Sequence, residues 1–171
     1  NDDARVLIVK AKRGAGELCD GCKTPGVCKA KGCMAETMEK LRAAIDALQD
    51  HGITCASVNA GGDLRVIGPE PEPIYLRQSH SATPLLAGLL QDGACATSAI
   101  HFSQQRHAGQ AISALVHPQR RQAVQSPDSF SVIAPLCAVA DALTKVLALA
   151  RQTPQPCFAH FGAHAFITPG L

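Results

Sequence analysis

Hydrophobic residues recur along this chain at two spacings, one typical of helices and one typical of strands. Apolar positions three and four residues apart run through Met34–His51, and Gly52 follows. The same spacing fills Leu136–Arg151, behind Pro135. Both segments are predicted to be helices that bury one apolar stripe.

Short runs rich in small and β-branched residues lie around the two helices and predict strands. A brief helix or turn is expected at Pro84–Leu90, because Thr83 can cap it and proline suits a first helical position. We expect the runs 111–116 and 129–134 to pair across a long polar connection. The predicted strands are Arg5–Lys10, Ile53–Val58, Leu64–Ile67, Ile74–Gln78, Ala94–Ser98, Ala111–Val116, Ser129–Ala134 and two in the tail that meet at Gly162.

These elements predict an α+β fold, with an antiparallel sheet and the two main helices on one of its faces. The domain is expected to span residues 34–171, which is ample for one hydrophobic core. Residues 1–33 are interpreted as an appendage, formed by a strand and a loop rich in glycine and cysteine. Such a loop buries little apolar area and depends on a staple for its order.

Charge and composition exclude some classes of partner. The net charge is +2, Trp is absent and only one Tyr is present, so no nucleic-acid surface is expected. No apolar run reaches the roughly eighteen residues of a membrane span, so we expect no transmembrane segment in this chain. The chain begins with Asn1, and we interpret it as a trimmed product, which leaves open a targeting segment upstream.

Eight cysteines divide into a cluster and four isolated residues. The cluster has the spacing Cys-x2-Cys-x5-Cys-x4-Cys, which is compatible with a zinc site or an iron–sulfur cluster. Two local disulfides or free thiols are the alternatives, and the spacing does not choose among them. The clustered residues are Cys19, Cys22, Cys28 and Cys33. The isolated ones, interpreted as small buried hydrophobes, are Cys55, Cys95, Cys137 and Cys157.

Candidate chemistry is concentrated in one turn, one strand and one helix. Asn59 and Asp63 flank Gly61 and Gly62, and such a turn either lets a ligand approach the backbone or simply closes a hairpin. Thr97 and Ser98 put two hydroxyls on a small-residue strand, which suits a ligand wall or an ordinary buried strand. Asp141 and Thr144 lie three residues apart and share a side of the second helix.

Four segments, in order, resemble the motifs of the FAD:protein FMN transferases, the ApbE flavin transferases. They are Asn59–Gly68, which is similar to the family's glycine-rich strand and turn, Ala94–Ser98, Leu115–Pro118 and Ala140–Thr144. The resemblance covers approximately residues 41–171 and the C-terminal half of that family. It implies a protein that binds FAD and moves FMN, with magnesium, onto a hydroxyl of a partner protein.

The resemblance also implies roles for individual residues. Asn59, Gly61, Gly62, Asp63, Thr97, Ser98 and Lys31 would bind the flavin nucleotide, and Asp141 and Thr144 would hold Mg²⁺. His117 is the local candidate for a general base. A periplasmic or membrane-associated location follows from the resemblance as well.

The chain departs from the family pattern at three motifs. Ala99 stands where a glycine is expected, and Ala114 and His117 stand where the family has histidine and aspartate. Thr144 comes one residue early, with Lys145 at the family's threonine position. We therefore keep two alternatives: a non-catalytic flavin-binding or assembly protein, and a metal-binding cysteine loop on a degenerate scaffold.

Overall fold

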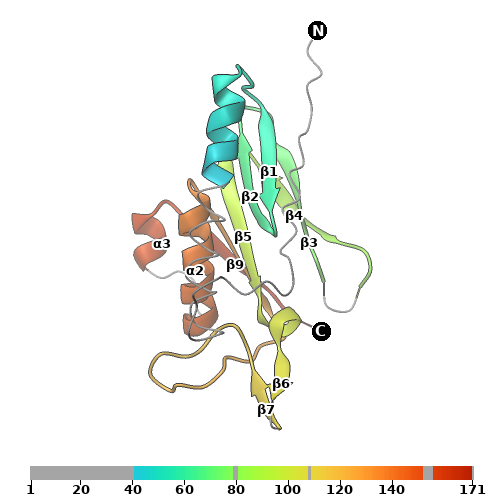
Figure 1. The fold of residues 1–171 in the computed structure, drawn as a ribbon, viewed down its shortest axis with the longest axis vertical. Helices are drawn as coiled ribbons and strands as arrows, with labels where there is room; N and C mark the ends of the chain where they lie inside the picture. Colours follow the sequence, from blue (N-terminus) through green and yellow to red (C-terminus); the bar gives the residue numbers. More distant parts are fainter. Residues whose placement is uncertain (1–40, 79–80, 108, 152–155, 171) are drawn as a thin grey trace, which may run out of the picture.

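The computed structural model describes residues 41–78, 81–107, 109–151 and 156–170. Five strands form one sheet in the order β1-β2-β5-β8-β9, and every neighbouring pair is antiparallel. Figure 1 shows the strands of this sheet beside the helices. Its strands are β1 (Ala56–Ala60), β2 (Asp63–Ile67), β5 (Gly93–Ala99), β8 (Ser129–Ala134) and β9 (His164–Thr168).

Smaller elements surround the main sheet. Two hairpins are formed by β3 (Glu72–Leu76) with β4 (Leu85–Leu90) and by β6 (Gln105–His107) with β7 (Gln110–Ile112). The helices are one over residues 41–50, α2 (Cys137–Ala150), α3 (Pro156–His160) and the short 3₁₀ helix η1 (Ile100–Ser103). Among the described residues, no helix combines the length and the apolar character needed to cross a membrane.

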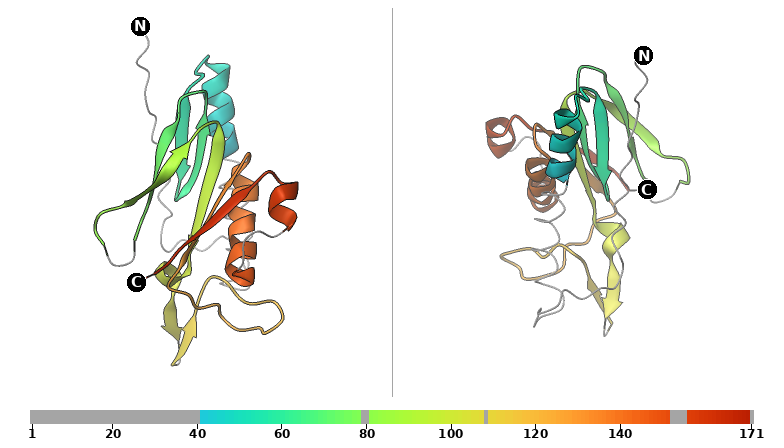
Figure 2. Two further views of the ribbon diagram at one scale, coloured as in Figure 1. Left: turned by 180° about the vertical axis from the view of Figure 1, so that it is seen from behind. Right: turned by 45° about the horizontal axis from the view of Figure 1, so that its top comes forward.

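The helix over 41–50 and α2 lie on the same face of the sheet, as Figures 1 and 2 show from three directions. Leu147 of α2 packs with Phe130 and Val132 of β8, and all three side chains are fully buried. The other helix places Leu41 and Ile45 in a second cluster with residues of β1 and β2. This layering confirms the predicted α+β fold with two main helices on one face.

The β3–β4 hairpin packs against the opposite face of the sheet. Ile74, Leu76 and Leu90 form a cluster there with Val66 and Cys95. Strand β5 is therefore covered on both faces, and its first four residues are all buried. A strand buried on both faces needs side chains small enough for two layers to approach, which explains why the run Gly93–Ala96 contains only small residues.

Three predicted elements differ from the structure. Within the segment Pro84–Leu90, residues Leu85–Leu90 form strand β4 instead of a helix or turn. So short a helix gains little, whereas the strand gains ladder hydrogen bonds from β3. The runs 111–116 and 129–134 do not pair, since β8 is occupied by β5 and β9 on its two edges. The tail begins with α3 where a strand was expected, and this turn of helix brings Phe158 into the main core.

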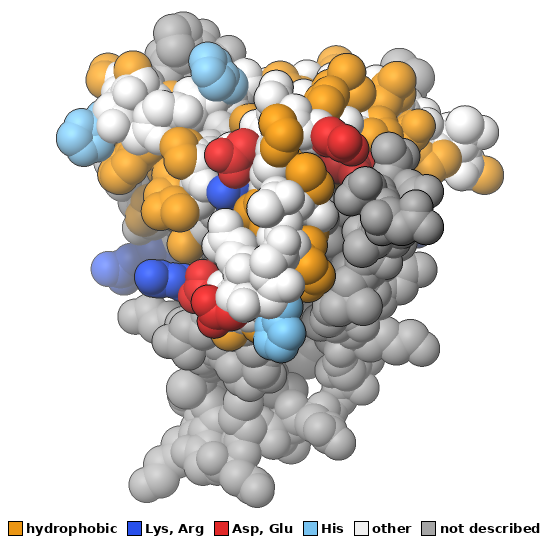
Figure 3. Space-filling view, turned by 90° about the horizontal axis from the view of Figure 1, so that it is seen from above, with side chains coloured by type: hydrophobic (Ala, Val, Ile, Leu, Met, Phe, Trp, Pro, Cys, Tyr) orange, Lys and Arg blue, Asp and Glu red, His pale blue; other side chains and the backbone are white. Residues whose placement is uncertain are grey.

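Several predictions concern segments outside the described residues. The strand Arg5–Lys10, the cysteine cluster of the first 33 residues and the beginning of the first helix all belong to this group. The four isolated cysteines are described, and each is a free thiol. Cys95 and Cys137 are buried as predicted, whereas Cys55 and Cys157 are only half-buried. The face of the molecule seen from above carries acidic and basic side chains dispersed among hydrophobic ones (Figure 3).

The core contact of α2 predicts a large cost for shortening Leu147. Leu147→Ala should lower the free energy of unfolding by about 2–5 kcal/mol, since it leaves a cavity against Phe130. Its neighbour Val146 is 38% exposed, so Val146→Ala should change the value by less than about 1 kcal/mol. Urea unfolding of both variants measures the difference, and equal costs would contradict the described packing.

Candidate functional site

The glycine-rich turn closes a tight hairpin between β1 and β2. Ala60 and Asp63 are opposite each other in the register, so Gly61 and Gly62 alone form the loop. Both glycines have positive φ, 71° and 110°, a conformation that side chains resist. The amide of Gly62 donates to Oδ1 of Asn59 at 3.0 Å, so the asparagine side chain holds the turn in place. The hairpin reading of this turn is confirmed.

The sheet register brings this turn to the same end of the sheet as the hydroxyl-bearing part of β5. Leu64 of β2 lies opposite Cys95, and the antiparallel register places Asp63 at the level of Ala96. Gly61 and Gly62 form the turn just beyond Asp63, at the end of the sheet towards which Thr97 and Ser98 extend. The two predicted ligand-binding segments are therefore neighbours.

Thr97 and Ser98 face opposite sides of the sheet, because successive strand residues alternate. Thr97 Oγ1 lies 2.9 Å from Oγ of Ser131 on β8, on the face that carries the β3–β4 hairpin. Ser98 Oγ lies 2.7 Å from Oγ1 of Thr144, on the helix face. Only Ser98 of this pair joins the residues of α2.

Thr144 is enclosed by polar partners of its own. Its hydroxyl donates to the carbonyl oxygen of Asp141 at 2.7 Å, and Ser98 then donates to it from β5. The Thr144 side chain has no exposed surface. This chain of hydroxyls satisfies buried polar groups in the helix–sheet contact.

Asp141 forms an ion pair with Lys145, one turn further along α2. The ammonium of Lys145 donates to Oδ1 of Asp141. Asp141 is only 7% exposed, whereas the Lys145 side chain is one-third exposed and reaches solvent. A buried carboxylate needs such a partner, because leaving water without one is costly.

Asp63 and Cys137 connect the hairpin to the beginning of α2. The thiol of Cys137 donates to the carbonyl oxygen of Leu64 at 3.2 Å. Burial raises the pKa of Cys137 to about 12, and the carboxylates of Asp63 and Asp141 add to this shift. Burial and Asp63 likewise raise the pKa of Cys95 to about 11. Both thiols are therefore neutral at physiological pH.

The predicted magnesium ligands do not fit Mg²⁺ in this arrangement. The ion prefers several oxygen ligands in an octahedral shell. Here the Thr144 hydroxyl is buried between two partners, and the Asp141 carboxylate faces an ammonium. The described part of the chain also has no cluster of three or more His, Cys, Asp or Glu side chains suited to a metal.

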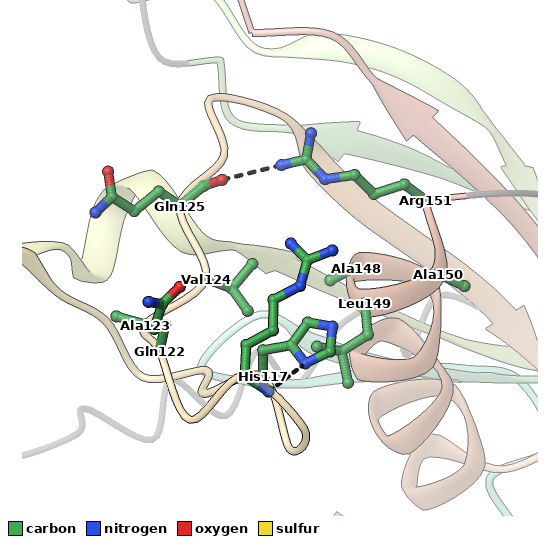
Figure 4. Close-up of a pocket in the computed structure, with 10 residues that line it drawn as sticks. His117, Gln122, Ala123, Val124, Gln125, Ala148, Leu149, Ala150 and Arg151 are labelled. Carbon is green, nitrogen blue, oxygen red and sulfur yellow. Dashed lines mark hydrogen bonds between the residues drawn. The ribbon is translucent and has the colours of Figure 1, made fainter.

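His117 lies elsewhere, beside the C-terminal end of α2. It lines a cavity of about 290 Å³ together with residues 120, 122–125 and 148–151 (Figure 4). Its Nδ1 accepts from the amide of Arg120 at 3.3 Å, and Arg151 donates to the carbonyl oxygen of Gln125 at 2.9 Å. Asp141 is seven residues from Ala148, roughly 10 Å along a helix axis. The structure therefore does not bring His117 together with Asp141.

His101 is a feature that sequence reasoning missed. It follows β5 in η1, and its ring lies against that of Phe102, with centroids 4.1 Å apart and the two planes tilted by 48°. Both ring nitrogens are buried and have no hydrogen-bond partner among the described residues. The sequence pattern indicated only a departure from the resembled motif here, because burial of a ring cannot be read from neighbouring letters.

The sequence matches the model of the ApbE family over residues 29–162, which is most of the chain. The chain belongs to the ApbE family. The predicted resemblance is thereby confirmed. No curated protein matches the sequence in the comparison made with it.

Three solved ApbE structures share the fold. The ApbE protein of Thermotoga maritima is 24% identical, with a TM-score of 0.55 over 68% of this chain and 42% of its own. The apo flavinyl transferase ApbE of Pseudomonas stutzeri is 20% identical, with a TM-score of 0.54 over 77% and 44%. A point mutant of the flavin transferase ApbE from Vibrio cholerae is 19% identical, with a TM-score of 0.54 over 77% and 42%. The chain thus spans less than half the length of these structures.

The buried thiols predict a loss of stability in alkaline solution. Their folded pKa values lie above the ordinary value of 9.0, so neutral thiols favour folding below pH 9 and this contribution is lost towards pH 12. When the pH is raised from about 8 to about 11, the free energy of unfolding should fall in both proteins. The fall should be smaller in Cys137→Ala than in wild type, by on the order of 2 kcal/mol. Urea unfolding at both pH values measures this difference, and parallel pH profiles would contradict it.

Proposed function

We propose that this ApbE-family chain binds FAD at the end of the sheet where the β1–β2 turn, Ser98 and the middle of α2 meet. The observation that carries this proposal is that the motifs of the β1–β2 turn, β5 and α2 lie close together in the fold. Three motifs lie far apart in sequence, yet the register of β2 on β5 and the Ser98–Thr144 contact bring them together. Converging polar groups beside a glycine turn are a suitable environment for a nucleotide with a diphosphate.

Asp63 and Asn59 would fix the turn, and the open space at the glycines would admit the ligand. A Cβ placed on either Gly61 or Gly62 meets no atom within 4 Å, so the backbone there is accessible from outside. On the helix side of the sheet Lys145 supplies ammonium hydrogens, and Ser98 holds Thr144 in place. Thr97, on the other face, would support β8 instead of touching the nucleotide. Lys31 lies outside the described residues, so its role as a flavin ligand stays a prediction.

FMN transfer requires more than binding. A partner's hydroxyl oxygen would form a bond to the phosphorus of the FMN half, the diphosphate P–O bond would break, and AMP would leave. The hydroxyl proton needs a base, and developing charge on the leaving AMP needs stabilisation, a role that magnesium would supply if bound. His117 is distant from Asp141, and the magnesium ligands are engaged elsewhere. We therefore propose weak or absent transfer alongside FAD binding.

Two other functions stay open as hypotheses. A flavin-binding or assembly protein without catalysis needs the same site but neither base nor metal, and the partners of Asp141 and Thr144 favour it. A flavinylation-target protein is a partner only if transfer occurs. The cysteine cluster lies outside the described residues, so zinc or iron–sulfur binding by it stays a prediction. Its residues are Cys19, Cys22, Cys28 and Cys33.

Covalent flavinylation separates an enzyme from a binder. With FAD, Mg²⁺ and an acceptor peptide, this chain should give no more than a faint fluorescent band in a gel, since losing a positioned base costs roughly 10²–10⁴ in rate. An active ApbE flavin transferase serves as the positive control. Rapid labelling by this chain that stops in Asp141→Ala would contradict the proposal and make it an active transferase.

The glycine turn offers a direct test of the binding site. Gly62→Val should abolish FAD retention while the protein stays folded, because a branched side chain fills the ligand's space and resists a φ of 110°. Gly52→Val is the matched control. Gly52 also has positive φ and open surroundings, but it follows the helix over 41–50 and lies outside the site. Fluorescence titration with FAD compares the two, and equal retention would remove the turn from the site.

A further inference from the structure

We infer that the ammonium of Lys145 takes the place of a magnesium ion in this chain, so that the diphosphate of a flavin nucleotide binds without metal. The inference rests on the proposed FAD site and specifies how its anionic part is held. It follows from the contacts of three residues of α2, Asp141, Thr144 and Lys145. Each of these contacts bears on a different requirement of a metal site.

The first requirement is a free carboxylate, and Asp141 does not provide one. Its Oδ1 accepts from the Lys145 ammonium, and its carboxylate is nine-tenths buried. A divalent ion at this carboxylate would lie beside a positive charge, and at a separation of a few ångströms such repulsion amounts to several kcal/mol in partly buried surroundings. The negative charge of the Asp141 carboxylate is already neutralised by the ammonium of Lys145.

The second requirement is a second oxygen ligand, and Thr144 is not available. Its hydroxyl hydrogen goes to the Asp141 carbonyl oxygen, and Ser98 donates to it from β5. Moving it towards an ion would break both hydrogen bonds in a contact without exposed surface. One residue further along the helix, where an oxygen would point beside Asp141, the side chain is that of Lys145.

The third point is that Lys145 can do what the ion would do for the nucleotide. An ammonium carries three hydrogens, and the bond to Asp141 uses one. The side chain is one-third exposed, so its head can meet a ligand from solvent while Asp141 holds its orientation. A lysine held in this way is a point charge suited to phosphate oxygens.

Three variants, compared with wild type, test the inference. Lys145→Thr puts an oxygen beside Asp141 and removes the ammonium. Because Lys145→Met would leave Asp141 buried without a partner, the double variant Asp141→Asn with Lys145→Met removes both charges together. Arg42→Thr removes an exposed helical cation that lies on another helix and serves as the control. Circular dichroism establishes that each variant is folded.

Two readouts are used, FAD binding by fluorescence titration in EDTA or in millimolar Mg²⁺, and Mn²⁺ binding by electron paramagnetic resonance without flavin. Wild type and Arg42→Thr should bind FAD equally in both media and hold no Mn²⁺. Lys145→Thr should bind FAD only with Mg²⁺ and should bind Mn²⁺. The double variant should lose FAD affinity by about tenfold or more in both media.

The outcomes separate this inference from the proposed function. FAD binding by wild type that requires Mg²⁺, or Mn²⁺ held by wild type, overturns the inference and leaves the FAD site standing. Unchanged FAD affinity in the double variant also overturns it. No FAD binding in any medium overturns the proposed function and this inference with it, whereas the Mn²⁺ spectra then still decide whether Lys145 excludes a divalent ion.

Discussion

The apolar contact between α2 and the sheet places every polar group of the candidate site. Phe130 and Val132 on β8 meet Leu147 on the helix, and none of the three side chains is exposed. This contact fixes the rotation of α2 about its axis. Residues that share the buried side of the helix must then face β5, and Thr144 reaches Ser98 for this reason. A different rotation would turn Asp141 towards solvent and separate the motifs.

Burying that helix face also determines the chemistry available there. Hydroxyls and a carboxylate within a packed contact must find partners inside the protein, because an unpaired buried polar group is costly. Thr144 and Asp141 find theirs in the helix backbone, in Ser98 and in Lys145. The partners that stabilise the fold are therefore the same groups that compete with a metal ion. A single residue, Lys145, connects the packing of the domain with its proposed mode of nucleotide binding.

The two faces of the sheet pack against different elements. The helix face holds the candidate site, whereas the opposite face carries the β3–β4 hairpin and its cluster around Val66 and Cys95. Small residues in β5 allow both layers to approach the same strand. The matched ApbE structures extend well beyond the part that this chain shares, so the likeness concerns one region of their fold. Within that region the site combines segments from β1, β2, β5 and α2.

Local patterns determined much of this structure. The apolar spacing in Leu136–Arg151 predicted α2 to within a residue at each end, and the paired glycines predicted the turn between β1 and β2. Motif order indicated the family, which the match over residues 29–162 confirms. These features are local because helix periodicity and positive φ depend on near neighbours alone. The segment Pro84–Leu90 was misjudged, since its strand exists only through the partner β3.

Tertiary structure decided which of the candidate residues meet. The sequence put Thr97 and Ser98 side by side, but strand alternation sent them to opposite faces, and only Ser98 contacts α2. His117 followed the others in motif order, yet its loop folds against the far end of α2. The pairing of Lys145 with Asp141 became visible only when burial of the carboxylate was known. Proximity across a sheet or a helix contact arises from the simultaneous packing of distant segments, and no local pattern of residues contains that information.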